Sequence, residues 1–398
     1  MTGRLGKILT DCRQFNVKTL HNAVLNVAES RLQIARPRSY PVRLDIVLTK
    51  ACNLRCTFCI SYGSLTGARW LDFRLYEQIA RELFPRAVSV NFCSGGEPFL
   101  YPQFREALQL ARKYRVYVKV VSNGTLLNQD TARWVAGDQT LQEMLISFDG
   151  ARKETLERIR RGASYPAILR NLEFLSGLKA GRNLAYPKLA FHYIIMKSNA
   201  RELPEIFPLC ARVGVEKVRV TYLNVANALE IDESLFHHQE LAAQVFQEAA
   251  KRAKEWGIAL ELPLLPSQDA GQHRCLIPWQ FCQVDTDGSI RFCYRSWRQR
   301  LGFFTSGFES IWRGPHYQKI RRTLNSSSPY FPYCLHCPNR LGVNQEASHI
   351  QAYYPEAYVI NGLEAWQVPF NPREQENILS FGGRKQEAGS AAPLEDGP

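Results

Sequence analysis

The pattern of hydrophobic and polar positions divides the chain into a helical start, a long alternating middle and an irregular end. Residues 1–42 predict an amphipathic helical arm, because Leu20, Val24, Val27 and Leu32 recur at helical spacing before two prolines. From residue 43 onward, short apolar runs alternate with longer stretches of helical periodicity. Six of these runs are predicted to be strands: 44–48, 87–92, 116–121, 143–148, 189–195 and 217–223.

The stretches between these runs have the periodicity of helices, for example residues 75–83, 104–114 and 165–178. Strands that alternate with helices predict parallel β-strands joined by crossover helices. Six such units within residues 43–265 fit a partial, open (β/α)6 barrel better than a closed eight-stranded barrel. In α/β folds of this kind the chemistry takes place at the C-terminal ends of the strands.

A change of character near residue 266 predicts a second, smaller domain. Residues 266–345 are rich in cysteine and aromatic residues, and Asp287-Gly288 predicts the turn of a hairpin at 284–290. Residues 346–374 are predicted to be a C-terminal extension. Residues 375–398 are rich in Gly, Ala, Ser and charge, which predicts a disordered tail.

Composition and charge narrow the class of protein. The chain has 398 residues, of which 45% are hydrophobic and 22% charged, which is typical of globular proteins. No apolar run approaches the ~20 residues that span a bilayer, and the start lacks the features of a secretory signal, so we predict a cytoplasmic protein. The net charge of +13 indicates either an anionic partner or a solvated basic surface. The basic arm lacks the interleaved aromatic residues of a nucleic-acid platform, which argues against a nucleic-acid partner.

The chain contains eleven cysteines. In a reducing compartment clustered cysteines indicate metal ligands rather than disulfides. Seven form two groups with ligand-like spacing: Cys52, Cys56 and Cys59, then Cys275, Cys293, Cys334 and Cys337. Cys12, Cys93 and Cys210 lie outside these groups and are interpreted as core residues.

The first group has the spacing CxxxCxxC and directly follows the first predicted strand. Three thiolates can wrap one face of a metal centre, and thiolate is the soft ligand that suits iron–sulfur clusters and zinc. Because no fourth cysteine is near, one metal position lacks a protein ligand, which is what a catalytic cluster requires. The alternative is structural zinc that borrows a distant fourth ligand, although structural zinc usually shows paired CxxC knuckles.

With Phe58 before the last cysteine, this motif resembles the hallmark of the radical S-adenosylmethionine (radical SAM) superfamily, and the resemblance covers residues 43–225. It implies that Cys52, Cys56 and Cys59 hold a 4Fe–4S cluster whose open iron binds S-adenosylmethionine. An external one-electron donor such as flavodoxin or ferredoxin would reduce this cluster. Reductive cleavage would then give methionine and a 5′-deoxyadenosyl radical that abstracts a substrate hydrogen.

Four further segments resemble family motifs that follow successive strands. Residues 95–98 match the GGEP motif, in which glycines permit close backbone approach and a glutamate accepts the ammonium group of the cofactor. Residues 122–124, 147–150 and 194–199 match later segments, although a plain turn, a strand-end hydroxyl and a surface charge remain the alternatives for them. The resemblance implies these cofactor-binding residues: Gly95, Gly96, Glu97, Ser122, Ser147 and Lys197.

The second group supplies four thiolates, which suits either structural zinc or a fully ligated cluster. Residues 275–279, 287–293, 310–312 and 334–337 resemble the SPASM/twitch domains appended to many radical SAM enzymes. That resemblance implies an auxiliary 4Fe–4S cluster on Cys275, Cys293, Cys334 and Cys337, and the cysteine count is closer to the shorter twitch form. With no open iron, this cluster is expected to transfer electrons or support structure rather than anchor substrate.

The substrate is the least determined part of the hypothesis. Our main prediction is oxidation or remodelling of a small sugar-, cyclitol- or nucleoside-like metabolite. The alternative is a maturase that modifies a ribosomally made peptide. Cys282 lies between two presumed ligands and is a core thiol, an alternative ligand or a hydrogen donor to a substrate radical. A non-enzyme alternative is a zinc-binding protein that attaches to nucleic acid.

Elemental analysis of the purified protein separates the enzyme from the zinc-binding alternative. The enzyme hypothesis predicts a brown protein with about eight irons per chain and little zinc, since each 4Fe–4S cluster carries four irons. The alternative predicts a colourless protein with about one or two zincs and an affinity for nucleic acid that falls with salt. Zinc in place of iron would contradict the enzyme hypothesis.

Overall fold

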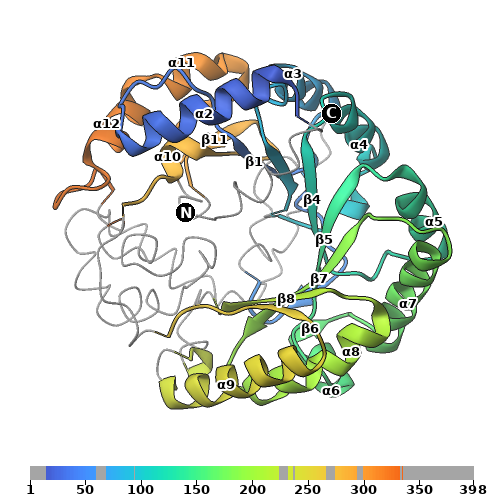
Figure 1. Cartoon of the computed structure of the whole chain (residues 1–398). Helices are drawn as coiled ribbons and strands as arrows, with labels where there is room; N and C mark the ends of the chain where they lie inside the picture. The colour runs from blue at the N-terminus through green and yellow to red at the C-terminus, as the bar shows by residue number, and fades with distance from the viewer. Residues whose placement is uncertain are drawn as a thin grey trace, which may run out of the picture.

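The structure is a computed structural model of the chain. It describes residues 15–59, 69–93, 95–223, 232–235, 238–265, 274–293, 299–331 and 334. Strands form the inner layer of an open ring, and helices cover its outer side (Figure 1). The predicted segments 346–374 and 375–398 lie outside the described residues.

All six predicted strands are present and parallel to their neighbours in one sheet. Their bounds are β1 (Arg43–Ile46), β3 (Ser89–Phe92), β4 (Tyr117–Ser122), β5 (Leu141–Ser147), β7 (Lys188–Ile195) and β8 (Lys217–Tyr222). A short β9 (Ala259–Glu261) continues the sheet beyond β8. The predicted partial α/β barrel is therefore confirmed.

Crossover helices connect these strands on the outside of the sheet (Figure 1). They are α3 (Phe73–Leu83), α4 (Phe104–Lys113), α5 (Gln129–Asp138), α6 (Lys153–Ile159), α7 (Tyr165–Gly181), α8 (Ile206–Val213) and α9 (Gln239–Glu255), with 3-10 turns η2 (Pro98–Leu100) and η3 (Ala200–Glu205). The apolar core lies between strands and helices, where Leu44 and Ile46 of β1 cluster with residues such as Tyr76 and Ile79 of α3. Among the helices of the described residues, none is both long enough and apolar enough to cross a membrane.

The opposite faces of the same strands are polar. Because side chains alternate along a strand, Asp45 points away from the core that holds Leu44 and Ile46, and its carboxylate accepts a 2.7 Å hydrogen bond from Asn91. On neighbouring strands Lys119 pairs with Glu143 at 2.9 Å. Farther around the sheet, Arg219 pairs with Glu261 at 2.6 Å, and the Arg219 side chain is almost fully buried. The interior of the barrel is thus lined by paired polar groups.

The cysteine-rich segment extends the barrel sheet rather than forming a sheet of its own. Its elements are α10 (Ile277–Gln280), β10 (Phe281–Val284), β11 (Ser289–Arg291), β12 (Gly302–Phe303), η6 (Phe304–Ser306), α11 (Phe308–Trp312) and α12 (Pro315–Thr323). Strand β10 lies parallel to β1, and β11 and β12 follow in antiparallel order. The predicted hairpin is confirmed, and its Gly288 has a φ of +77° that suits glycine. The predicted boundary at residue 266 therefore does not interrupt the sheet.

Helix α2 (Val17–Arg31) confirms a helix in the N-terminal arm, but its most buried face is polar rather than apolar. Polar residues such as Asn22 and Asn26 are buried, whereas Val24 is 71% and Leu32 73% exposed. The Asn26 amide donates to the Trp279 carbonyl at 2.6 Å and to the Tyr40 carbonyl at 3.1 Å. The polar face is buried because its amides satisfy backbone carbonyls of the neighbouring segments, and α2 accordingly lies beside α10 (Figure 1).

Replacing Asn26 with alanine should lower the free energy of unfolding by about 1–3 kcal/mol, because the buried Trp279 carbonyl loses its 2.6 Å hydrogen bond. Chemical denaturation of the purified chain measures this change. The matched control is Val24→Ala on the exposed face of the same helix, which should change stability by less than about 0.5 kcal/mol. A larger loss in the control than in Asn26→Ala would contradict the burial of the polar face.

Candidate active site at the carboxyl ends of the strands

The first cysteine group lies on the loop that follows β1. The Cys52 side chain is exposed, and Cys56 and Cys59 are half-buried. Within this loop β2 (Arg55–Cys56) pairs with β6 (Arg160–Arg161) in a small antiparallel sheet, with Cys56 opposite Arg160. The three thiols are thus placed at the C-terminal edge of the barrel, where the sequence predicted the chemistry.

The surroundings of these thiols suit a metal cluster. The Leu54 N–H lies 3.4 Å from the Cys52 sulfur, and an Arg160 N–H donor lies 3.8 Å from the Cys56 sulfur. Burial raises the pKa of Cys56 to about 11; Arg160 opposes this shift and the neighbouring thiols add to it. A cationic cluster would compensate the mutual repulsion of three thiolates. Within the described residues no three His, Cys, Asp or Glu side chains stand close enough to hold a metal ion, and ligation of a cluster by these thiols stays a prediction.

The glycines that follow β3 are required by a close backbone contact. The Gly96 N–H donates to the Thr49 carbonyl at 2.7 Å, and the Glu97 N–H donates to the Ala51 carbonyl at 2.7 Å. A Cβ at Gly96 would lie 1.8 Å from the Ala51 oxygen, and one at Gly95 would lie 2.4 Å from the Thr49 oxygen. Only glycine leaves room for this contact, which holds the loop that leads to the cysteines.

Glu97 connects this loop to the end of β4. Its carboxylate, only 2% exposed, accepts hydrogen bonds from the Ser122 hydroxyl at 2.9 Å and from the Asn123 N–H at 2.7 Å. Burial raises the pKa of Glu97 to about 7, against the lowering effect of these hydrogen bonds. The Ser122 hydroxyl also accepts from the Gly124 N–H at 3.1 Å. The structure therefore brings Glu97 and Ser122 together, and their contacts with S-adenosylmethionine stay predictions.

Ser147 and Lys197 are placed differently. Ser147 ends β5 as a buried residue, in register with His192 of β7, so it too lies at the carboxyl edge of the sheet. Lys197 follows β7 and forms an ion pair with Asp232 at 2.8 Å, with both side chains exposed. This pairing favours the surface-charge alternative for Lys197 over a cofactor contact.

Two residues of this site were missed by the sequence analysis. The Asp149 side chain is fully buried and forms a 2.6 Å ion pair with the buried Arg160. Burial raises the pKa of Asp149, and Arg160 counteracts that shift. The motif at 147–150 contains Asp149, but we assigned its role to the serine alone. The sequence signal for this pair was an acidic residue directly after a strand, Asp149, with the run Arg160-Arg161-Gly162 farther along the chain.

The second group is partly described. Cys275, Cys293 and Cys334 are buried, and Cys337 lies outside the described residues. Both backbone groups of Cys275 are bound by the Asn325 amide, at 2.8 and 3.2 Å. Ligation of an auxiliary cluster by these cysteines stays a prediction.

The prediction that Cys282 donates hydrogen to a substrate is not supported by its position. Cys282 is fully buried on β10, in register with Leu44, whose side chain packs toward the helices. Its thiol donates to the Gln283 carbonyl at 3.8 Å. Because it faces the outer helical layer rather than the barrel interior, its position favours the core-thiol alternative. Cys210, in α8, is likewise buried as predicted. Cys93 is half-buried, and its thiol interacts with the Asp45 carboxylate.

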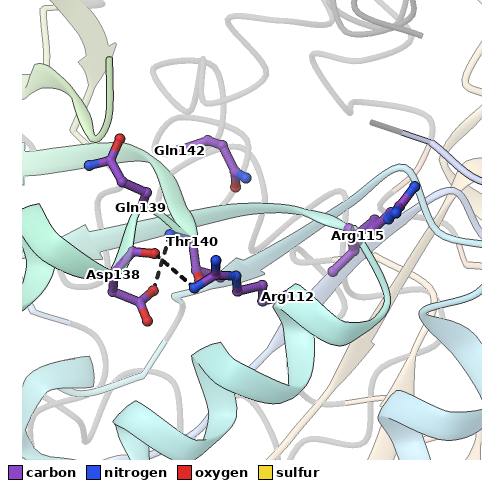
Figure 2. Close-up of a pocket in the computed structure, with 7 residues that line it drawn as sticks. Arg112, Arg115, Asp138, Gln139, Thr140 and Gln142 are labelled. Carbon is purple, nitrogen blue, oxygen red and sulfur yellow. Dashed lines mark hydrogen bonds between the residues drawn. The ribbon is translucent and has the colours of Figure 1, made fainter. Parts of the chain in front are cut away.

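An open pocket lies at the opposite end of the barrel (Figure 2). Its lining includes Arg112, Arg115, Asp138 and Thr140, which precede β4 and β5. Asp138 accepts hydrogen bonds from the Thr140 N–H at 3.0 Å and, through its carbonyl, from Arg112 at 3.4 Å. Because these residues stand at the N-terminal ends of the strands, this pocket is separate from the cysteine site.

Comparisons with known proteins agree with this site. Residues 46–210 match the family model of the radical SAM superfamily, and residues 275–338 match SPASM, an iron–sulfur cluster-binding domain. The chain is 30% identical over 299 residues to the mycofactocin maturase MftC of Mycolicibacterium smegmatis, covering 71% of this chain and 72% of that protein. The chain belongs to the radical SAM superfamily. It is also 25% identical to the PqqA peptide cyclase of Gluconobacter oxydans, over 64% of this chain and 71% of that one.

A solved structure has the same fold. Streptococcus suis SuiB bound to the precursor peptide SuiA superposes with a TM-score of 0.60 at 17% identity, covering 80% of this chain and 74% of SuiB. With radical SAM and SPASM domains, the cofactors of this enzyme are S-adenosylmethionine and two 4Fe–4S clusters. Family membership overturns the alternative of a zinc-binding protein without enzymatic activity.

Replacing Gly96 with alanine should remove the first cluster, because the new Cβ cannot fit against the Ala51 carbonyl. The expected loss is about four irons per chain, one 4Fe–4S unit, measured by iron analysis after anaerobic reconstitution. The matched control is Gly177→Ala in α7, where a Cβ meets nothing within 4 Å. Full iron content in Gly96→Ala would show that this contact does not hold the cysteine loop.

Proposed function

We propose that this radical SAM enzyme modifies a peptide substrate. The observation that carries the proposal is the similarity to MftC, a maturase, over 71% of this chain. The likeness to a peptide cyclase supports the same class of substrate. Our main prediction, a sugar-, cyclitol- or nucleoside-like metabolite, gains no such support, and the peptide alternative fits the relatives better.

When bound, the cofactors supply a 5′-deoxyadenosyl radical that removes a substrate hydrogen atom. The residues of the chain hold and orient the reactants. Glu97 and the backbone of residues 95–97 keep the cysteine loop against the ends of β3 and β4.

The arrangement of the sheet supports a redox role for the second cysteine group. The loop with Cys52 follows β1, and the hairpin that leads to Cys293 begins with β10, the parallel neighbour of β1. Both cysteine groups therefore flank adjacent strands of one sheet, although at opposite edges: Cys52 follows the end of β1, and the register of β11 with β10 brings Cys293 beside the start of β10. In this proposal the auxiliary cluster accepts an electron across the length of these strands as a substrate radical loses a proton and becomes an oxidised product.

Transfer of deuterium identifies the substrate class. The reconstituted enzyme is incubated with S-adenosylmethionine, dithionite and a perdeuterated synthetic peptide copied from a short open reading frame beside its gene. We expect deuterium in the 5′-deoxyadenosine and a mass change in the peptide. Parallel reactions contain perdeuterated sugars, cyclitols and nucleosides, and Cys56→Ala is the control for background cleavage. Deuterium that comes from one of the small metabolites, and not from the peptide, would overturn the proposal.

A further inference from the structure

Arg160 is a buried cation placed directly against the predicted cluster site. It begins β6, where it pairs across the small sheet with Cys56 of β2, and it is only 5% exposed. One terminal nitrogen lies 3.8 Å from the Cys56 sulfur. The guanidinium carbon also lies 5.6 Å from the centre of the Phe58 ring. Arg160 therefore contacts two residues of the CxxxCxxC loop, Cys56 and Phe58.

The orientation of Arg160 is fixed from the other side. Its second terminal nitrogen pairs with the Asp149 carboxylate at 2.6 Å, and the Asp149 side chain has no exposed surface. The same carboxylate accepts the Ile194 N–H at 2.7 Å, and the Asn199 amide donates to the Asp149 carbonyl at 2.9 Å. A planar guanidinium held at one end presents its other N–H donors in a fixed direction. That direction is toward the Cys56 sulfur.

We propose that Arg160 is a positioning residue that sets the reduction potential of the catalytic cluster. Reduction adds negative charge to a group already surrounded by three thiolates, and a hydrogen-bond donor with positive charge stabilises that reduced state. Asp149 lies behind the guanidinium and offsets only part of its charge at the sulfur. Arg160 therefore raises the potential and makes the reduced cluster accessible to a biological electron donor.

This inference requires that Cys56 binds the cluster, but it does not depend on whether the substrate is a peptide. A residue that only anchored the loop would change how much cluster assembles, and not the potential of the clusters that do assemble. The midpoint potential therefore separates the two roles. The neighbouring Arg161 is an exposed arginine on the same short strand, opposite Arg55, and supplies a matched control.

The test is a redox titration of the full-length, anaerobically reconstituted protein, followed by electron paramagnetic resonance. The signal of the catalytic cluster is identified as the one that changes when S-adenosylmethionine is added. In Arg160→Gln we expect a more negative midpoint potential, because the cluster loses one charged hydrogen-bond donor. At the potential where half of the wild-type cluster is reduced, the ratio of reduced to oxidised cluster in the variant should be about tenfold lower. Arg160→Lys, which keeps the charge but loses the planar fork that reaches both Asp149 and Cys56, should shift the midpoint in the same direction by less than Arg160→Gln, and Arg161→Gln should not shift.

An unchanged midpoint in Arg160→Gln would overturn the proposal, even if the iron content fell. Asp149→Asn gives a second test if Arg160→Gln binds no cluster. The asparagine oxygen still accepts the guanidinium hydrogen bond, while the opposing negative charge is lost. We therefore expect Asp149→Asn to shift the midpoint in the positive direction. A shift in the negative direction, or none, would contradict the role of Arg160.

Discussion

The backbone of residues 95–97 lies directly against the backbone of residues 49–51, with two hydrogen bonds of 2.7 Å and no space for a side chain between them. This contact joins the end of β3 to the loop that leads from β1 to the first cysteine. Glu97 then carries the connection on to Ser122 and Asn123 at the end of β4. The position of the thiols at the edge of the barrel depends on this chain of contacts.

The alternation of short apolar runs and helical stretches was sufficient to predict the six barrel strands, because that pattern depends on local burial alone. The site at the strand ends followed from the same pattern, since every unusual motif falls after a strand. The buried face of α2 was not predictable in this way. Its periodicity is real, but the face that is buried is the one whose amides reach the carbonyl of Trp279, 253 residues away.

Cys282 and Arg160 show the same limit. Cys282 lies between two presumed ligands in the sequence, which left three roles open for it, and the register of β10 with β1 turns its side chain toward the helices. Arg160 is one of two adjacent arginines, and only the pairing of β6 with β2, across 104 residues, distinguishes the buried one from the exposed one. Long-range pairing decides which way these side chains point, and the local sequence pattern does not determine that pairing.

The account depends on one reaction at this edge of the barrel, the reductive cleavage of S-adenosylmethionine by the cluster on Cys52, Cys56 and Cys59. Chromatographic measurement of 5′-deoxyadenosine after anaerobic reconstitution and reduction with dithionite tests it directly. We expect 5′-deoxyadenosine from the wild-type protein and from Cys210→Ala, which alters a core thiol outside both groups, and none from Cys56→Ala. A wild-type protein with an intact cluster that forms no more 5′-deoxyadenosine than Cys56→Ala would contradict the account.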